Sequence, residues 1–289
     1  MPVTTHAATE YGTLQCVAVR YAGEFTRHLD GPDIHPVLAR QKGTSTWAPY
    51  SPAKVRAQQH ALIRLLRERG TEVVILPEAP GCSTQQYPRD IGFVIDDVLF
   101  AARLNSAHRL PEAVALTDLA AGTPNVAQLA AGTIEGGDVM LHDGCVLVGL
   151  SEETSPEGAD ALQAALAEHH IDREVAPVRF ATGGIVHLDD HFNIVAPGTA
   201  LIHRGVFPAD QVSWFDKRFD LIDVTDDEAL AVQVNVLAIA PGVVVVAEGS
   251  DRIAGELSAC GIEVITVDFC EVTRIPGSLR CTTLPLLRT

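Results

Sequence analysis

The sequence repeats one pattern: an apolar run, a short turn and a second apolar run, which together predict a β-hairpin. The pattern begins at Gly92, Asp138, Phe192 and Val234, in the segments GFVIDDVLFAA, DVMLHDGCVLVGL, FNIVAPGTALIHR and VNVLAIAPGVVVVAEG. The turns between the runs are rich in Asp, Gly and Pro, which favour tight reversals of the chain. A repeat of roughly 45 to 55 residues is typical of propellers and repeat arrays. This repeat constrains the fold more strongly than the composition does.

Amphipathic helical patterns separate the hairpins. Two of them begin at Ser51 and Ser155, where a serine that can cap the helix precedes a proline suited to its first turn. Another is expected from Ser250, and a shorter one near Asp227. Strand-like runs adjoin these helices and begin at Glu72, Glu174, Phe219 and Glu263.

The repeated unit is therefore strand, strand, helix, strand. Four hairpins lie within the chain, and a fifth forms if the first strand, TLQCVAVR, pairs with the last, TTLPLLR. That pairing would close a ring and remove both sheet edges. We predict an α/β fold with five-fold pseudo-symmetry, a propeller of ββαβ modules that forms a single domain over residues 1–289. An open α/β sheet in which the repeat is accidental is the alternative.

Charge and cysteine content limit the partners. A net charge of −16 opposes nucleic-acid binding, which needs clustered Lys and Arg, and is compatible with a small cationic substrate. None of the six cysteines forms a C-x-x-C pair, so neither zinc nor a redox couple is indicated. We expect a cytoplasmic protein with reduced thiols and no membrane partner, because signal-peptide and membrane-length apolar patterns are missing. The sequence leaves open whether identical chains associate.

Polar residues interrupt the apolar pattern at equivalent points of successive units. They are Asp90 in YPRD, Glu135 in EGGD, His187 and Asp189 in HLDD, and Cys281 in LRC. Equivalent positions of a pseudo-symmetric ring lie at one end and face its axis, so we expect these side chains in one pocket. A thiol beside an imidazole is a nucleophile with a general acid/base. The carboxylates would oppose a thiolate unless they hold a cation, and a planar guanidinium suits them.

In the motifs RD, EGGD, HLD and a C-terminal Cys, the sequence resembles the penteins, a superfamily that modifies guanidino groups. Its members include arginine deiminase, agmatine deiminase, dimethylarginine dimethylaminohydrolase and the amidinotransferases, and the resemblance covers nearly the whole chain. It implies five modules around a central site and chemistry without cofactor or metal. It also implies hydrolysis of a guanidino compound, such as arginine, a methylarginine or agmatine, to an amine or ammonia and a ureido product.

The resemblance further implies a role for each site residue. Cys281 would attack the guanidinium carbon and form a covalent thiouronium intermediate. His187 would protonate the departing amine and then activate water. Glu135 would bind a guanidinium nitrogen or orient His187, and Asp90 and Asp189 would bind the remaining guanidinium nitrogens.

Two further positions concern the rest of the substrate. Amino-acid-specific penteins hold the substrate carboxylate with two arginines, and Arg109 stands at the first position, nineteen residues after Asp90. The second position, in a segment resembling GLSxRT, holds Glu153. A carboxylate there would repel an α-carboxylate and could bind an amine, either of an agmatine-like substrate or of a free α-amino group. Free arginine stays open as a substrate.

Alternatives to these interpretations are an amidinotransferase, which would share the site and use an amine as acceptor, and a ring-shaped binding protein without activity. The other five cysteines are expected to be packing residues. His187 and His191 are four residues apart, but the segment runs into a strand, so we expect no metal there. The glycines of EGGD are interpreted as tight turns, and Asp190 as a structural cap.

Overall fold

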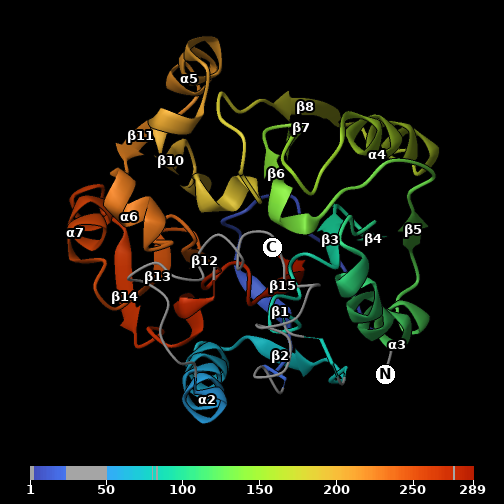
Figure 1. Cartoon of the computed structure of the whole chain (residues 1–289), viewed down its shortest axis with the longest axis horizontal. Helices are drawn as coiled ribbons and strands as arrows, with labels where there is room; N and C mark the ends of the chain where they lie inside the picture. The colour runs from blue at the N-terminus through green and yellow to red at the C-terminus, as the bar shows by residue number, and fades with distance from the viewer. Residues whose placement is uncertain (1–2, 24–50, 80, 83, 276) are drawn as a thin grey trace.

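The computed structural model describes residues 3–23, 51–79, 81–82, 84–275 and 277–289. Within them the strands form five sheets of three strands each, arranged around a common centre (Figure 1). In each sheet the middle strand pairs antiparallel with the inner strand and parallel with the outer strand. The predicted α/β fold with five ββαβ modules is thus confirmed.

The elements of the five modules follow in order. The first contains β15 (Leu284–Arg288), β1 (Leu14–Val19), α2 (Pro52–Glu68) and β2 (Glu72–Ile75). The second contains β3 (Gly92–Ile95), β4 (Val98–Ala101), α3 (Ala115–Ala121) and β5 (Val126–Gln128). The third contains β6 (Val139–His142), β7 (Cys145–Gly149), α4 (Pro156–Glu168) and β8 (Glu174–Val178). The fourth contains β9 (Phe192–Ala196), β10 (Thr199–Ile202), α5 (Ala209–Asp216) and β11 (Asp220–Asp223). The fifth contains β12 (Leu237–Ala240), β13 (Val243–Ala247), α7 (Asp251–Ala259) and β14 (Glu263–Val267).

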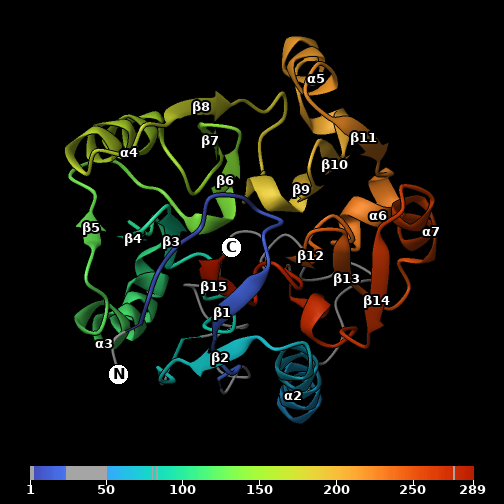
Figure 2. The same cartoon turned by 180° about the vertical axis from the view of Figure 1, so that it is seen from behind.

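Closure of the ring depends on the two ends of the chain. Strand β1 pairs antiparallel with β15, with Val17 opposite Pro285 and Ala18 opposite Leu284. From behind, both strands lie near the middle of the molecule, and the module helices lie at its periphery (Figure 2). The predicted pairing of first and last strand is therefore correct.

Local sequence explains where the helices begin. The hydroxyls of Ser51 and Ser155 accept hydrogen bonds from backbone N–H groups three residues later, and proline follows each serine. The helix predicted near Asp227 is α6 (Asp226–Leu230), but it connects β11 to β12 instead of belonging to a module. The module helices α3 and α5 were missed because each has only about two turns, too few to set a clear apolar period.

Apolar side chains pack between neighbouring modules as well as within them. Phe100 of the second module and Leu162 of the third belong to one buried cluster. Val195 of the fourth module and Val244 of the fifth belong to another. Each module thus completes its burial against the next, as expected for repeat architectures. Among the described helices, none has the length and apolar character needed to cross a membrane.

Candidate active site

Each module contributes a buried polar residue shortly before its inner strand. These residues are Cys281 before β15, Asp90 before β3, Glu135 before β6, His187 before β9 and Asn235 before β12. Asn235 was not among the predicted site residues. The sequence repeat could nevertheless have identified Asn235. It stands at the start of the fourth hairpin segment, VNVLAIAPG, at the position equivalent to that of the other four residues in their modules.

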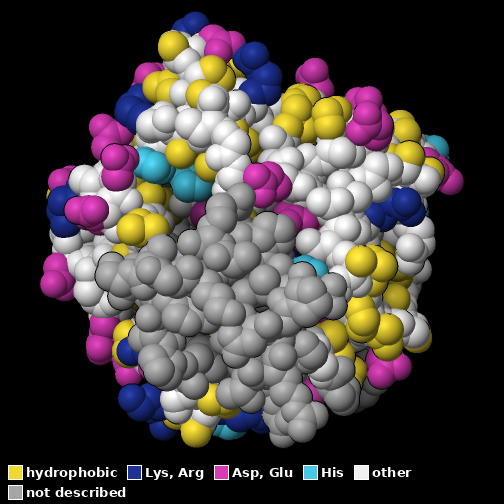
Figure 3. All heavy atoms as spheres, in the orientation of Figure 1, with side chains coloured by type: hydrophobic (Ala, Val, Ile, Leu, Met, Phe, Trp, Pro, Cys, Tyr) yellow, Lys and Arg dark blue, Asp and Glu magenta, His cyan; other side chains and the backbone are white. Residues whose placement is uncertain are grey.

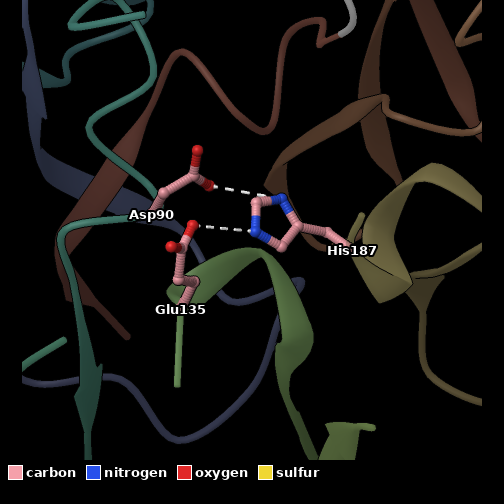
Figure 4. Close-up of side chains that lie close together, drawn as sticks. All are labelled: Asp90, Glu135 and His187. Atoms are coloured by element: carbon pink, nitrogen blue, oxygen red, sulfur yellow. Dashed lines mark hydrogen bonds and ion pairs between the residues drawn. The ribbon is translucent and has the colours of Figure 1, made fainter. Parts of the chain in front are cut away.

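The two ring nitrogens of His187 face the carboxylates of Asp90 and Glu135, which lie side by side (Figure 4). Its Nε2 is 3.0 Å from Glu135 Oε2, and its Nδ1 is 3.7 Å from Asp90 Oδ1. Burial alone would lower the pKa of His187, but the charge of Asp90 and the hydrogen bond with Glu135 outweigh it and raise this pKa well above the usual value. The imidazole is therefore positioned and charged as a proton donor.

The EGGD motif fits closely against this histidine. A Cβ atom on Gly137 would lie 2.6 Å from Cγ of His187, so any larger residue would displace the ring. Asp138 accepts hydrogen bonds from the Leu188 N–H at 2.8 Å and from the hydroxyls of Ser151 and Thr154 at 2.6 Å. The EGGD glycines do form the predicted tight turn, the short helix η2 (Gly136–Asp138), and close contact with the imidazole is a further requirement for glycine at 137. Asp138 ties the strand turn before β6 to the segment that carries His187.

The thiol of Cys281 is buried, and the side-chain amide of Asn235 makes hydrogen bonds with both its sulfur and its backbone N–H. The Asn235 Nδ2 donates to Cys281 Sγ at 3.0 Å, and the Cys281 N–H donates to Asn235 Oδ1 at 3.0 Å. The sulfur also lies 3.7 and 3.8 Å from the two carboxylate oxygens of Asp189. Burial and then the charge of Asp189 raise the pKa of Cys281 well above its usual value. Without a substrate this residue is therefore a thiol.

The histidine cluster and the cysteine lie in one site because two connections join them. His187 directly precedes the short helix η3 (Leu188–Asp190), which contains Asp189, so only Leu188 separates the two residues. The backbone N–H of Arg89, next to Asp90, donates to the carbonyl oxygen of Cys281 at 3.2 Å. The structure thus brings Asp90, Glu135, His187, Asp189 and Cys281 together, as predicted.

A second residue that the sequence did not identify is Arg280. Its Nη1 donates to Asp189 Oδ2 at 2.8 Å, and its Nη2 donates to Glu10 Oε2 at 3.2 Å and to the carbonyl oxygen of Val139 at 2.8 Å. The guanidinium is only 2% exposed, so it acts as a fixed internal cation. Asp189 therefore contacts the thiol while one of its oxygens is bound to arginine.

Arg109 lies against the histidine cluster. Its Nη1 donates to Asp90 Oδ2 at 3.0 Å and to Glu135 Oε2 at 3.1 Å, and its Nη2 donates to Glu112 Oε2 at 2.8 Å. Glu153 is buried as well, and its Oε2 accepts a bond from Ser106 Oγ at 3.4 Å. Arg109 and Glu153, the two residues predicted to contact the rest of the substrate, are therefore associated with one segment, the short helix η1 (Ala107–Val114), which begins directly after Ser106. Their contact with a substrate stays a prediction.

Two groups of potential metal ligands occur among the described residues, each with its donor atoms within 4.8 Å of one another. One contains Asp90, Glu135 and His187, and the other contains Asp189, Asp190 and Cys281. The guanidinium groups of Arg109 and Arg280 already bind oxygens of these groups, so a metal ion would compete with a fixed cation. His191, which we considered as a ligand beside His187, instead has its Nδ1 3.1 Å from Nδ1 of His203.

On the face of the molecule in Figure 3, a few acidic and histidine side chains lie beside the grey area, and further acidic side chains lie around the edge together with Lys and Arg. This distribution agrees with the net charge of −16. A net negative charge favours the approach of cationic molecules to the protein.

Known proteins resemble this chain in sequence and in structure. The uncharacterized protein YkgA of Bacillus subtilis is 32% identical over 296 residues, which cover 98% of this chain and 96% of YkgA. An arginine deiminase of Mycobacterium marinum is 28% identical over 228 residues, or 68% of this chain and 57% of the deiminase.

Among solved structures, the amidinotransferase SxtG of Microseira wollei superposes with a TM-score of 0.80 at 18% identity, over 98% of this chain and 97% of SxtG. At that identity the likeness establishes the fold alone. A sequence model of the eukaryotic N,N dimethylarginine dimethylhydrolase family matches residues 41–288. With the pentein ring, the central Cys–His–carboxylate set and a match over most of its length, the chain belongs to this family of the penteins.

Proposed function

We propose that this protein hydrolyses a guanidino compound, with Cys281 as nucleophile and His187 as general acid and base. The product would be a ureido compound together with ammonia or an amine. Family membership supports guanidino chemistry in general. The choice of reaction and the residue roles are proposed from the site's geometry.

The observation that carries this proposal is the binding of a guanidinium group by Asp90 and Glu135. Arg109 supplies that group from within the chain, and it uses one oxygen of each carboxylate. The other oxygens, Asp90 Oδ1 and Glu135 Oε1, are buried and have no hydrogen-bond partner among the described residues. Buried acceptors without donors are costly, so they favour a ligand with several N–H groups. A substrate guanidinium beside His187 would supply them.

The state of Cys281 is consistent with a cationic substrate. Burial and then the surrounding carboxylates raise the pKa of the thiol, so a thiolate is disfavoured in the free protein. A guanidinium bound beside the sulfur would oppose this effect, because an opposite charge at close range favours the ionised form. The nucleophile would then form mainly when a substrate is present.

The proposed reaction balances as follows. The Cys281 thiolate forms a C–S bond to the guanidinium carbon, and the C–N bond to the departing amine breaks as His187 donates its proton to that nitrogen. The resulting thiouronium remains on Cys281. Neutral His187 then accepts a proton from water, whose oxygen forms the new C–O bond. Rupture of the C–S bond gives the ureido product and returns the thiolate.

An amidinotransferase reaction is the second candidate, and the superposition on SxtG favours keeping it. The first half of the reaction would be the same, but an amine would replace water as acceptor. Because the site residues are shared, only the product distinguishes these two reactions.

The test is a panel of arginine, monomethylarginine, dimethylarginine, agmatine and guanidinobutyrate, incubated with and without an added amine and followed by mass spectrometry. We expect a ureido product from at least one compound, and loss of that product in Cys281→Ser. Cys260→Ser is the matched control, because Cys260 is an exposed thiol away from the site. Unchanged turnover in Cys281→Ser would exclude the thiol mechanism, and no product from the entire panel would favour a binding function.

A further inference from the structure

We propose that Arg109 is an internal competitor for the substrate guanidinium, which must displace the Arg109 Nη1 from Asp90 and Glu135 in order to bind. This inference rests on the proposed function and adds a specificity determinant to it. It differs from the role predicted from the sequence, in which Arg109 only holds a substrate carboxylate.

The first argument is the position of the Arg109 Nη1. It lies 3.0 Å from Asp90 Oδ2 and 3.1 Å from Glu135 Oε2, and this same Glu135 oxygen is 3.0 Å from His187 Nε2. Arginine and carboxylate pair most strongly when two parallel N–H groups meet both oxygens. A substrate can pair in this way with Asp90 only if it takes Oδ2 from Arg109. Two guanidinium groups on one carboxylate would also repel each other.

The second argument is that Arg109 can leave these carboxylates without becoming an unpaired buried charge. Its Nε and Nη2 donate to Glu112 Oε2 at 3.2 and 2.8 Å, and Glu112 lies on the same short helix. Glu112 is anchored in turn by Thr84 Oγ1, which donates to its Oε1 at 2.6 Å. Because the guanidinium is rigid and planar, Nη1 cannot move alone, but a tilt of the group about its Nε–Nη2 edge would carry Nη1 away from Asp90 and Glu135 while that edge still faces Glu112.

The third argument is that the helix η1 makes few apolar contacts with the rest of the protein. It is a 3₁₀ helix, whose hydrogen bonds are less well aligned than those of an α-helix, and it contains Pro111. Two of its apolar side chains face solvent, since Leu110 is 54% and Val114 is 67% exposed. Few apolar contacts therefore oppose a small shift of the segment that carries Arg109.

Displacement of Arg109 has a consequence for substrate choice. A substrate that carries an anionic group within reach can bind the released Nη1 and so recover part of the lost interaction. A substrate without such a group, for example methylguanidine or agmatine, must displace Arg109 without this compensation. Arg109 thus lowers the affinity of small guanidines more than that of anionic ones.

The experiment measures binding by calorimetry in a Cys281→Ser background, so that no turnover interferes. Arg109→Gln and Arg109→Lys are compared with this parent, using methylguanidine, agmatine and arginine as ligands. Lysine keeps a cation near Glu112 but lacks the planar fork, so this variant serves where glutamine destabilises the fold. We expect both variants to bind methylguanidine and agmatine about tenfold or more tightly than the parent, with a smaller gain or a loss for arginine.

Arg173→Gln is the matched control. Arg173 is a largely buried arginine that pairs with Asp96 and donates to the carbonyl oxygen of Ala8, neither of which lies on η1, and we expect its loss to leave methylguanidine affinity unchanged. If the parent binds guanidines but neither Arg109 variant binds methylguanidine more tightly, this inference is wrong while the proposed function stands. If neither the parent nor any variant binds a guanidine, the proposed function fails, and the inference fails with it.

Discussion

Replacement of Asn235 by alanine should slow the reaction by a factor that the structure allows us to estimate. Asn235 Nδ2 donates to Cys281 Sγ at 3.0 Å, and this bond strengthens when the sulfur becomes a thiolate. A hydrogen bond to a charged group contributes about 1.5–3 kcal/mol. Since each 1.36 kcal/mol changes a rate tenfold, kcat should fall by about 10- to 150-fold. KM should change little, because the amide contacts the nucleophile and not the carboxylates that bind the guanidinium.

Two assays follow this effect independently. Steady-state kinetics on the substrate found in the panel give kcat and KM. The pH dependence of iodoacetamide alkylation at Cys281, followed by peptide mass, reports the thiol pKa without any substrate. We expect the alkylation curve of Asn235→Ala to shift to higher pH, because the thiolate loses a donor.

Gln163→Ala is the control for loss of stability. Gln163 lies on α4, where its Nε2 donates to the carbonyl oxygen of Arg173 at 3.3 Å and its Oε1 accepts a bond from the Val175 N–H at 2.7 Å. Both variants should unfold a few degrees lower than the wild type, since each leaves backbone groups without a partner. The reasoning is refuted if Asn235→Ala keeps the kcat and the alkylation profile of the wild type, or if Gln163→Ala changes them equally.

Three further predictions concern charges around the site. Burial raises the pKa of Asp90 to about 6, so kcat/KM for a cationic guanidine should fall as the pH drops below about 6, and Asp90→Asn should remove this acid limb together with most activity. Asp189→Asn should lower the pKa of Cys281, because it removes a neighbouring charge; alkylation at pH 8 should accelerate while turnover falls, and slower alkylation would contradict this. Glu153→Arg should improve turnover of carboxylate-bearing substrates relative to agmatine, and the opposite shift in the kcat/KM ratio would show that Glu153 has another role.

The sequence predicted the fold well because its strongest signals are local and repeated. Each hairpin is marked by apolar runs and turn residues, and the closing pair β1–β15 follows from the need to leave no open edge. The helices α3 and α5 were not predicted, since such short helices form through packing against their sheets more than through their own periodicity.

Only those site residues that lie in sequence motifs were predicted. Asp90, Glu135, His187 and Cys281 lie in recognisable motifs, whereas Asn235 lies in an apolar hairpin and is identified by its place in the repeat alone. The pairing of Arg109 with Asp90 and Glu135 could not be read from the sequence. An arginine nineteen residues from an aspartate can point in many directions, and only the path of η1 turns this one toward the histidine cluster.

The formal charges of the site suggest why a cation and a thiolate should form there together. Around the imidazole, the carboxylates of Asp90, Glu135 and Glu112 face two cations, Arg109 and His187. This side is therefore one positive charge short of balance. A substrate guanidinium supplies one charge of that sign.

The side that holds the sulfur is balanced in formal charge while Cys281 is a thiol. Arg280, Arg89 and Arg288 are buried around Glu10 and Asp189, and burial lowers the pKa of Arg89 to about 9 and that of Arg288 to about 10. With Asp190, whose carboxylate lies within 4.8 Å of the sulfur and of Asp189, three carboxylates face these three cations, so a thiolate would add an uncompensated negative charge. Burial and the charges of Asp189 and Asp190 raise the pKa of Cys281 accordingly. A bound guanidinium adds a positive charge to the site, so its binding should favour the thiolate, and each of the two charges should stabilise the other.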